Sequence, residues 1–289
     1  MKWKGRRPST NIEDARGRRV VTGGVGLLLV RFVSQLWGAK GLGVLVLVGL
    51  IGWGTGLIDP AFFLGGTQVK QTDYQPTAEE QELFDFVSVV LADTEDIWTQ
   101  QFERLDLTYR PPQLVVYRSQ YPTGCGTGDA RMGPFYCPTD QNVYIDLSFY
   151  AELERQFEAP GDFAQAYVIA HEIGHHVQNL LGIQEQVARL RNQPDYNQYS
   201  VRLELQADYL AGVWAHNNSR YLDRGDIEEA MRAANGIGDD RIQSRTQGRI
   251  SPHAFTHGTS EQRMRWFNSG LQNGTIEGGD TFDMPYEQL

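Results

Sequence analysis

The sequence contains little cysteine and no excess of positive charge. Its 289 residues include two cysteines, too few for a disulfide-stapled scaffold or a four-cysteine zinc module. The net charge of -10 at pH 7 argues against a general nucleic-acid-binding protein, because such a protein needs a basic surface to contact phosphates. A hydrophobic fraction of 40% and a charged fraction of 21% are typical of a folded chain, which excludes a largely disordered or collagen-like protein.

The charge is unevenly distributed along the chain. Residues 1–40 carry nine lysines and arginines, with Glu13 and Asp14 as their acidic residues. The rest of the chain is strongly acidic, so we expect the two parts to lie in different surroundings. We interpret residues 1–40 as a basic N-terminal segment on the cytoplasmic side of a membrane, because cytoplasmic flanks of membrane spans are rich in Lys and Arg.

A run without charged side chains follows at residues 41–58. A helix of this length extends about 27 Å, enough for one transmembrane helix across a thin bilayer. Gly52 and Gly56 form a small-xxx-small pair through which two such helices would approach, which suggests a homodimer. A buried core helix is the alternative, but it would need apolar partners on every side. The sequence therefore predicts a single-pass protein of the cell (inner) membrane, with its domain outside the cytoplasm.

The remaining chain divides into a linker and one domain. Residues 59–78 are rich in Pro, Gly and Thr and show little periodicity, which is typical of a linker. Residues 79–289 show helical and strand patterns. Helices are predicted over 79–102, 163–181, 200–216, 226–236 and 260–271, and strands over 114–117 and 143–147. Several helices with a small sheet indicate a mostly helical α+β fold.

The strongest motif is H-E-x-x-H, formed by His171, Glu172 and His175 within the helix predicted over 163–181. Residues i and i+4 share one helical face, so the two histidines can bind one cation. Glu172 is turned about 100° around the axis, so its carboxylate lies beside the metal and can accept a proton from a water on it. Two surface histidines flanking an exposed Glu would match the same pattern, but the amphipathic helix favours the metal site.

A catalytic zinc needs a third protein ligand and leaves its fourth position to water. The remaining histidines and the carboxylates are the candidates. The longer H-E-x-x-H-x-x-G-x-x-H motif is absent, since Gln178 and Leu181 occupy its Gly and His positions. We predict Glu204, on the next strong helix, as the third ligand of one Zn²⁺ per chain. Asp208, one turn later, is predicted to accept a hydrogen bond from the far nitrogen of a ligand histidine.

The H-E-x-x-H helix followed by Glu204-x-x-x-Asp208 resembles the gluzincin arrangement of thermolysin-like proteases and of integral-membrane CAAX-type proteases. Nearly the whole chain also resembles the bacterial family called putative neutral zinc metallopeptidases. The segments that carry this resemblance are MKWKGRRPSTNIEDARG (1–17), GPFYCPTDQNVYIDLSFY (133–150), AHEIGHHVQNLLGI (170–183), RLELQADYLAGVWAH (202–216) and FTHGTSEQRMRWF (255–267). The resemblance implies a zincin-like (gluzincin) catalytic domain, a zinc cofactor and a hydrolytic activity.

The same resemblance suggests roles for two residues near the C-terminus. In CAAX-type proteases, a His six residues before an Arg opens a late helix and lines the active site. By that similarity, His257 is a catalytic residue that stabilises an oxyanion, and Arg263 braces the Glu204 carboxylate. This sequence has Gly258 where those proteases usually carry Pro. A loop histidine and a surface arginine are the alternative.

Three further features each allow two interpretations. Cys125 and Cys137 either form a disulfide, which an extracytoplasmic domain favours, or are two ordinary thiols. The run 142–146 is either an edge strand that binds an extended peptide or a core strand. Asp239 and Asp240 favour a turn or cap role over acid–base chemistry.

Together these features predict a membrane-anchored, zinc-dependent peptidase that hydrolyses a peptide or protein substrate. A tethered zinc-binding scaffold without turnover is one alternative, although metal binding alone would not need Glu172. A zinc hydrolase of non-peptide amides or esters is another. A strand-binding edge beside the metal would favour peptide substrates.

Overall fold

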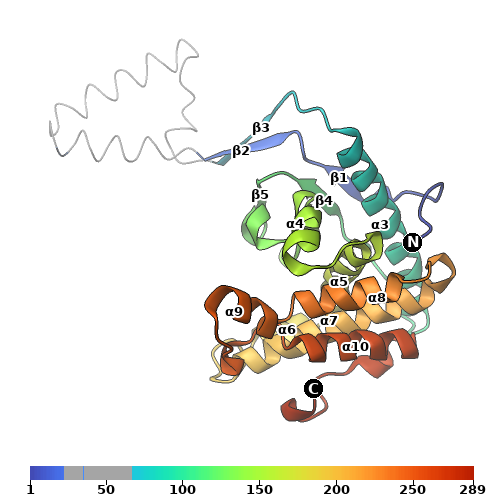
Figure 1. Ribbon diagram of the computed structural model, residues 1–289, viewed down its shortest axis with the longest axis vertical. Helices are drawn as coiled ribbons and strands as arrows, with labels where there is room; N and C mark the ends of the chain where they lie inside the picture. Colours follow the sequence, from blue (N-terminus) through green and yellow to red (C-terminus); the bar gives the residue numbers. More distant parts are fainter. Residues whose placement is uncertain (23–34, 36–66) are drawn as a thin grey trace.

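The computed structural model describes residues 1–22, residue 35 and residues 67–289. It shows a mixed α+β fold dominated by helices (Figure 1), which confirms the predicted fold class. The helices are α3 (Ala78–Glu103), α4 (Ser148–Phe157), α5 (Asp162–Leu180), α6 (Ile183–Ala188), α7 (Tyr196–Asn217), α8 (Asp226–Gly236), α9 (Asp239–Gln247) and α10 (Ser260–Asn273). The strands are β1 (Ile12–Asp14), β2 (Arg18–Thr22), β3 (Thr67–Gln71), β4 (Leu114–Tyr117), β5 (Gln120–Thr123), β6 (Gly126–Asp129), β7 (Phe135–Cys137) and β8 (Asn142–Asp146).

A four-stranded sheet has the order β1-β4-β8-β7. Strands β1, β4 and β8 are parallel, and β7 is antiparallel to β8. The run 142–146 is therefore an interior strand between β4 and β7, and its interpretation as an edge strand is wrong. Strand β7 is the edge strand next to β8, because β8 is its one partner among the described strands.

Helix α5 lies between the sheet and helices α7 and α8. It contacts β7 and β8 as well as α7 and α8, and α10 packs against both α7 and α8 (Figure 1). The crossing of α7 and α10 is very close. A Cβ atom on Gly212 would lie 2.0 Å from the carbonyl oxygen of Phe267, and one on Gly270 would lie 1.9 Å from that of Tyr209. Only glycine permits this approach, which brings the side chains of α10 to the centre of α7.

Residues 1–22 of the N-terminal segment pack against the helical domain, whereas the predicted boundary at residue 40 lies outside the described residues. Strand β1 pairs in register with β4. The Met1 amine lies 2.7 Å from a carboxylate oxygen of Asp162, and Arg6 forms an ion pair with Asp93 of α3. The first four basic side chains pair with acidic side chains of the helical part: Lys2, Lys4, Arg6 and Arg7. Arg16 and Arg18 pair instead with Asp14 and Glu13 of their own segment.

The predicted linker 59–78 also differs from the structure. Its residues 67–71 form β3, which pairs antiparallel with β2, so that Arg18 opposes Gln71 and Thr22 opposes Thr67. Prolines, glycines and threonines around this strand obscure its pattern in the sequence. The two-stranded ribbon thus places residues 18–22 beside residues 67–71, a few residues before α3.

The predicted membrane span, residues 41–58, lies outside the described residues, as do Gly52 and Gly56. Within the parts of the chain that the structure describes, none of the helices has both the length and the apolar character that a membrane crossing requires.

A disulfide joins Cys125 and Cys137, whose Cα atoms are 5.8 Å apart. Cys125 lies in the turn between β5 and β6, and Cys137 is the last residue of β7. The bond therefore fixes the β5–β6 hairpin beside one end of the edge strand.

Candidate metal centre

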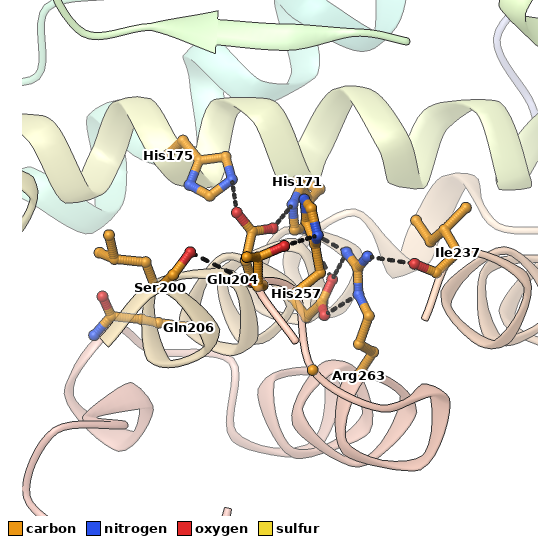
Figure 2. Close-up of polar contacts among 12 residues, drawn as sticks. His171, His175, Ser200, Glu204, Gln206, Ile237, His257 and Arg263 are labelled. Atoms are coloured by element: carbon orange, nitrogen blue, oxygen red, sulfur yellow. Dashed lines mark hydrogen bonds and ion pairs between the residues drawn. The ribbon is translucent and has the colours of Figure 1, made fainter. Parts of the chain in front are cut away.

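Three side chains from two helices converge on one point. His171 and His175 project from α5, and Glu204 faces them from α7 (Figure 2). The Nε2 atoms of His171 and His175 lie 3.2 Å and 3.5 Å from the carboxylate oxygens of Glu204. One potential ligand atom from each residue lies within 4.8 Å of the others. The three residues predicted as zinc ligands are thus brought together.

Gly174, inside the motif, allows α5 and α7 to approach. A Cβ atom at this position would lie 3.0 Å from the carbonyl oxygen of Ala207 and 3.1 Å from its Cα atom. A larger residue would push the two helices apart and move Glu204 away from the histidines. The residue types inside H-E-x-x-H therefore matter for the packing as well as for the ligands.

His171 is held from behind by a buried charged network. Its Nδ1 atom lies 2.8 Å from a carboxylate oxygen of Asp208, which also accepts a hydrogen bond from the Tyr167 hydroxyl. Arg263 donates to both oxygens of Asp208, at 2.8 Å and 3.0 Å. Asp208 thus makes the predicted contact with the far nitrogen of a ligand histidine. Arg263, which we expected to brace Glu204, instead pairs with Asp208, because the α7–α10 crossing aims its side chain at that carboxylate.

His175 is held by a chain of neutral amides that the sequence reasoning missed. Its Nδ1 atom lies 2.9 Å from Gln178 Oε1. Gln178 donates from Nε2 to the carbonyl oxygen of Leu203 at 2.7 Å and to Gln206 Oε1 at 3.0 Å. Gln206 donates in turn to the carbonyl oxygen of Gly279 at 2.9 Å. The spacing of Gln178, three residues after His175 on one helix, is the signal that could have revealed this contact.

These partners fix which nitrogen of each histidine carries the proton. Backbone carbonyls can only accept hydrogen bonds, so Gln178 must present its Oε1 to His175. The carboxylate of Asp208 likewise accepts from His171, because Arg263 and His171 hold the pKa of Asp208 below its ordinary value although burial alone would raise it. Both histidines therefore carry a proton on Nδ1, and Nε2 of each is the atom directed at Glu204, available to a cation once it has given up its own proton.

The electrostatics of the three ligands suit a divalent cation. Burial opposes the charged form of His171, but Asp208 and Glu204 overcome it and raise its pKa to about 10. Burial also acts to raise the pKa of Glu204, yet the imidazoles of His175 and His257 hold this pKa well below its ordinary value. The carboxylate thus stays ionised beside two imidazoles. Two imidazoles and one carboxylate that together line an open cavity match the donor set that would hold a catalytic zinc.

Glu172 is buried beside the three ligands and lines the same cavity. Burial raises its pKa, while the imidazoles of His175 and His171 act in the opposite direction. A carboxylate with a raised pKa is a stronger base than an exposed one, which is the property that a general base needs.

His257 also lines this cavity, with a side chain that is 49% exposed. Its Nδ1 atom lies 2.9 Å from the hydroxyl of Thr256 and 3.3 Å from a carboxylate oxygen of Asp239. The second carboxylate oxygen of Asp239 accepts hydrogen bonds from the backbone N–H groups of Thr256 and His257, each at 2.6 Å. Asp239 therefore holds the turn before α10, within the turn or cap role that we expected, and it also contacts the ring of His257.

The edge strand is fastened to the helix that carries the motif. The Tyr136 hydroxyl lies 3.1 Å from His176 Nδ1 and accepts a hydrogen bond from Asn179 at 2.9 Å. The other nitrogen of His176 donates to the carbonyl oxygen of Arg110 at 2.7 Å. Burial lowers the pKa of His176 to about 4, so this histidine is neutral and structural. It sets the distance between β7 and the metal centre.

One other acidic group in the described part of the chain has the spacing of a metal site: Asp162, Asp226 and Glu229. The Met1 amine lies within it, 2.7 Å from Asp162 and 3.5 Å from Asp226. A cation from the chain itself therefore occupies this position.

The fold and the site define a candidate metal centre of the H-E-x-x-H class, in which Glu204 of a second helix lies beside the two histidines. A family profile described as putative neutral zinc metallopeptidase matches residues 1–282, and the chain belongs to this family. The family name specifies zinc, in agreement with the cofactor expected from the sequence.

Relatives of this chain occur in Escherichia coli and Mycobacterium tuberculosis. The uncharacterized protein YpfJ of Escherichia coli (strain K12) is 48% identical over 289 residues, which cover 98% of this chain and 99% of YpfJ. The uncharacterized protein Rv2575 of Mycobacterium tuberculosis (strain H37Rv) is 43% identical over 188 residues, or 60% of this chain and 63% of that protein. No solved structure matches this chain.

Proposed function

We propose that this protein is a zinc-dependent peptidase that uses Glu172 as its general base. The observation that carries the proposal is the convergence of His171, His175 and Glu204, with the buried carboxylate of Glu172 beside them and an open cavity in front. Metal binding needs the three ligands alone. A second carboxylate, with a raised pKa and in the same cavity, supports turnover over a purely structural role.

Zinc held by these ligands would polarise the scissile carbonyl and lower the pKa of an attacking water. Glu172 takes a proton from that water and then gives it to the nitrogen of the leaving amine. His257, once protonated, donates from Nε2 toward the oxyanion that develops on the carbonyl. Asp208 and Gln178 hold the ligand histidines in one tautomer, so the site is ordered before the substrate arrives.

The edge strand supports a peptide substrate. Phe135 and Tyr136 of β7 line the cavity that contains Glu172, and β7 pairs with β8 along one side only. An extended peptide added to the free side would gain main-chain hydrogen bonds and run past the metal centre. A small non-peptide amide or ester would leave this edge unused.

We also propose that residues 41–58 attach the protein to a membrane and that the domain lies outside the cytoplasm. The disulfide between Cys125 and Cys137 supports an oxidising compartment. The pairing of Thr22 with Thr67 changes the expected topology. Because residues 18–22 and 67–71 form one ribbon, both lie on the same side of the membrane as the domain, which does not fit the cytoplasmic N-terminal segment expected from the sequence.

The test compares the full-length wild-type protein with Glu172→Gln. We expect one zinc per chain in both by elemental analysis, and cleavage of casein or of a peptide library in the wild type alone. Glu185→Gln, a carboxylate on α6 with a side chain that is 72% exposed, is the matched control and should cleave like the wild type.

Two results would contradict the proposal. Absence of zinc from the wild type would remove the assigned site. Zinc in both proteins, with equal cleavage or with none, would assign Glu172 no catalytic role and would favour a scaffold that binds zinc.

A further inference from the structure

We propose that the cavity beside the metal centre binds one large apolar side chain of the substrate, aromatic or branched aliphatic, next to the scissile bond. This inference rests on the proposed peptidase function and names the substrate class of the same site.

The cavity has a volume of about 410 Å³, within the range of roughly 300–1,000 Å³ that is usual for ligand pockets. Its lining combines two kinds of chemistry. Among the described residues that line it, every carboxylate, imidazole and guanidinium belongs to the metal centre described above. The rest of the lining is mainly apolar, and we refer to this part as the apolar wall: Phe135, Phe149, Phe157, Val168, Ile237 and Ile242.

This apolar wall is assembled from separate elements. Phe149 and Phe157 lie at the two ends of α4, and Val168 lies on α5, three residues before His171. Ile237 and Ile242 come from the junction of α8 and α9. Because at least four elements contribute to it, the apolar wall is part of the fold itself. It begins on the side of the metal centre that is nearer the start of α5.

The wall leaves apolar surface accessible. Phe149 and Val168 are buried, with exposed fractions of 9% and 5%, whereas Phe157, Ile237 and Ile242 are only half-buried. An apolar ligand side chain would remove this surface from water, which favours binding. A charged side chain would lose its hydration there and find no partner on the wall, which disfavours it.

The edge strand limits how many side chains enter the cavity. Successive side chains of an extended peptide point to opposite faces of a sheet. A peptide paired with β7 therefore directs alternate side chains toward α5 and the cavity, and the others away from it. With the scissile carbonyl at the metal centre, one neighbouring side chain reaches the apolar wall. The expected preference is thus confined to one position of the substrate.

The first experiment measures binding, so that it does not depend on turnover. Full-length, zinc-loaded Glu172→Gln is titrated with blocked octapeptides of alanine and serine that carry Phe, Leu, Gly or Asp at one central position. We expect the Phe and Leu peptides to bind at least about tenfold more tightly than the Gly and Asp peptides. Wild-type protein is then given a mixed peptide library, and mass spectrometry locates the cleaved bonds, which should lie next to large apolar residues.

A variant of the wall tests the assignment. Ile242→Asp places a charge on the wall at a half-buried side chain that does not pack on the hydrophobic core of the described residues. We expect it to weaken binding of the Phe peptide about tenfold or more and to leave the Gly peptide unchanged. Ile250→Asp is the matched control, since Ile250 is 53% exposed and does not line the cavity.

The outcomes separate this inference from the proposed function. Equal binding of Phe and Gly peptides, or binding of neither, would overturn the inference whatever the wild type cleaves. Equal effects of Ile242→Asp and Ile250→Asp would overturn the assignment of this wall. A preference for Phe in binding, without cleavage by the wild type, would overturn the peptidase function and leave the apolar wall as a binding surface for a large apolar side chain.

Discussion

The two ligand histidines are one helical turn apart, yet their supports differ in kind. His171 donates to the carboxylate of Asp208, whose charge Arg263 balances from another helix. His175 donates to Gln178, a neutral amide anchored on backbone carbonyls. A buried charged support contributes to the folded state as a unit, because removal of one member leaves the other charge without a partner. A neutral support can be removed at a smaller cost, so it affects the ligand more than the fold.

The largest effect is expected from Asp208→Ala, which tests the charged support. Arg263 is 2% exposed and would be left as an uncompensated buried charge, so we expect the free energy of unfolding to fall by about 3–5 kcal/mol. Urea unfolding of the metal-free protein measures this loss. The control is Asp195→Ala, an exposed residue at the start of the same helix whose side chain makes no cap hydrogen bond.

A double variant sharpens this prediction. Asp208→Leu combined with Arg263→Met removes both charges, so it should recover most of the lost stability but not the affinity for zinc. A loss of less than about 1 kcal/mol in Asp208→Ala would mean that Arg263 is solvated in the folded protein, which contradicts the buried network.

Gln178→Met tests the neutral support and should separate affinity from stability. The proton on Nδ1 of His175 loses its acceptor, so we expect the zinc dissociation constant to rise about 10- to 100-fold. The free energy of unfolding should fall by only about 1–3 kcal/mol, for the donors and acceptors left unpaired. Chelator competition measures the first and urea unfolding the second. Gln198→Met, at an exposed position of α7, is the control, and a zinc affinity within twofold of the wild type would contradict the assigned role of Gln178.

A third support, from Asp239 to His257, is charged but only partly buried, so its effect should be smaller. Glu204 and, after it, Asp239 raise the pKa of His257 above its ordinary value of 6.5. Because Nδ1 faces Asp239, Nε2 donates only when the ring is protonated. We therefore expect kcat/KM to fall as the pH rises through this raised pKa.

Asp239→Asn removes a negative charge near the ring, which lowers the pKa of His257. The alkaline limb of the pH profile should move to lower pH by roughly 0.5–1 unit. Asp240→Asn is the control, because Asp240 bonds to Ser260 and not to His257. An unmoved limb in Asp239→Asn would remove His257 from the reaction.

The smallest effect on both supports is expected when residues 23–66 are replaced by a turn of four residues. Thr22 and Thr67 are paired neighbours, so a short hairpin turn can join them. The free energy of unfolding and the zinc affinity should stay unchanged, since neither support contacts this ribbon, and flotation with liposomes should be lost. Continued flotation would place the membrane contact elsewhere in the molecule.

The metal centre could be predicted because its signals are local. The spacings between His171 and His175 and between Glu204 and Asp208 each lie within one helix, where the repeat of the helix determines which side chains share a face. The partner of Arg263 was not predictable in this way, because it depends on the crossing of α7 and α10 that Gly212 and Gly270 permit.

The placement of residues 1–22, in contrast, could not be predicted from the sequence. Their basic side chains suit the flank of a membrane span and also suit pairing with acidic helices, and composition does not distinguish the two. The partner of Arg6 is Asp93, far along the sequence, and β1 contains three residues. A strand this short carries no reliable alternation, so its place beside β4 became visible only in the three-dimensional arrangement.

The docking of Met1 on Asp162, 161 residues further along the chain, has a consequence for the order of folding. Residues near Met1 leave the ribosome well before Asp162, so they have no partner there until most of the domain has been made. Contacts of such long sequence separation form late and slowly, since the loop they close costs entropy before any contact repays it. In the meantime β4 has an open flank. The beginning of the chain is therefore among the last parts to be placed, and it closes the sheet once the helices have assembled.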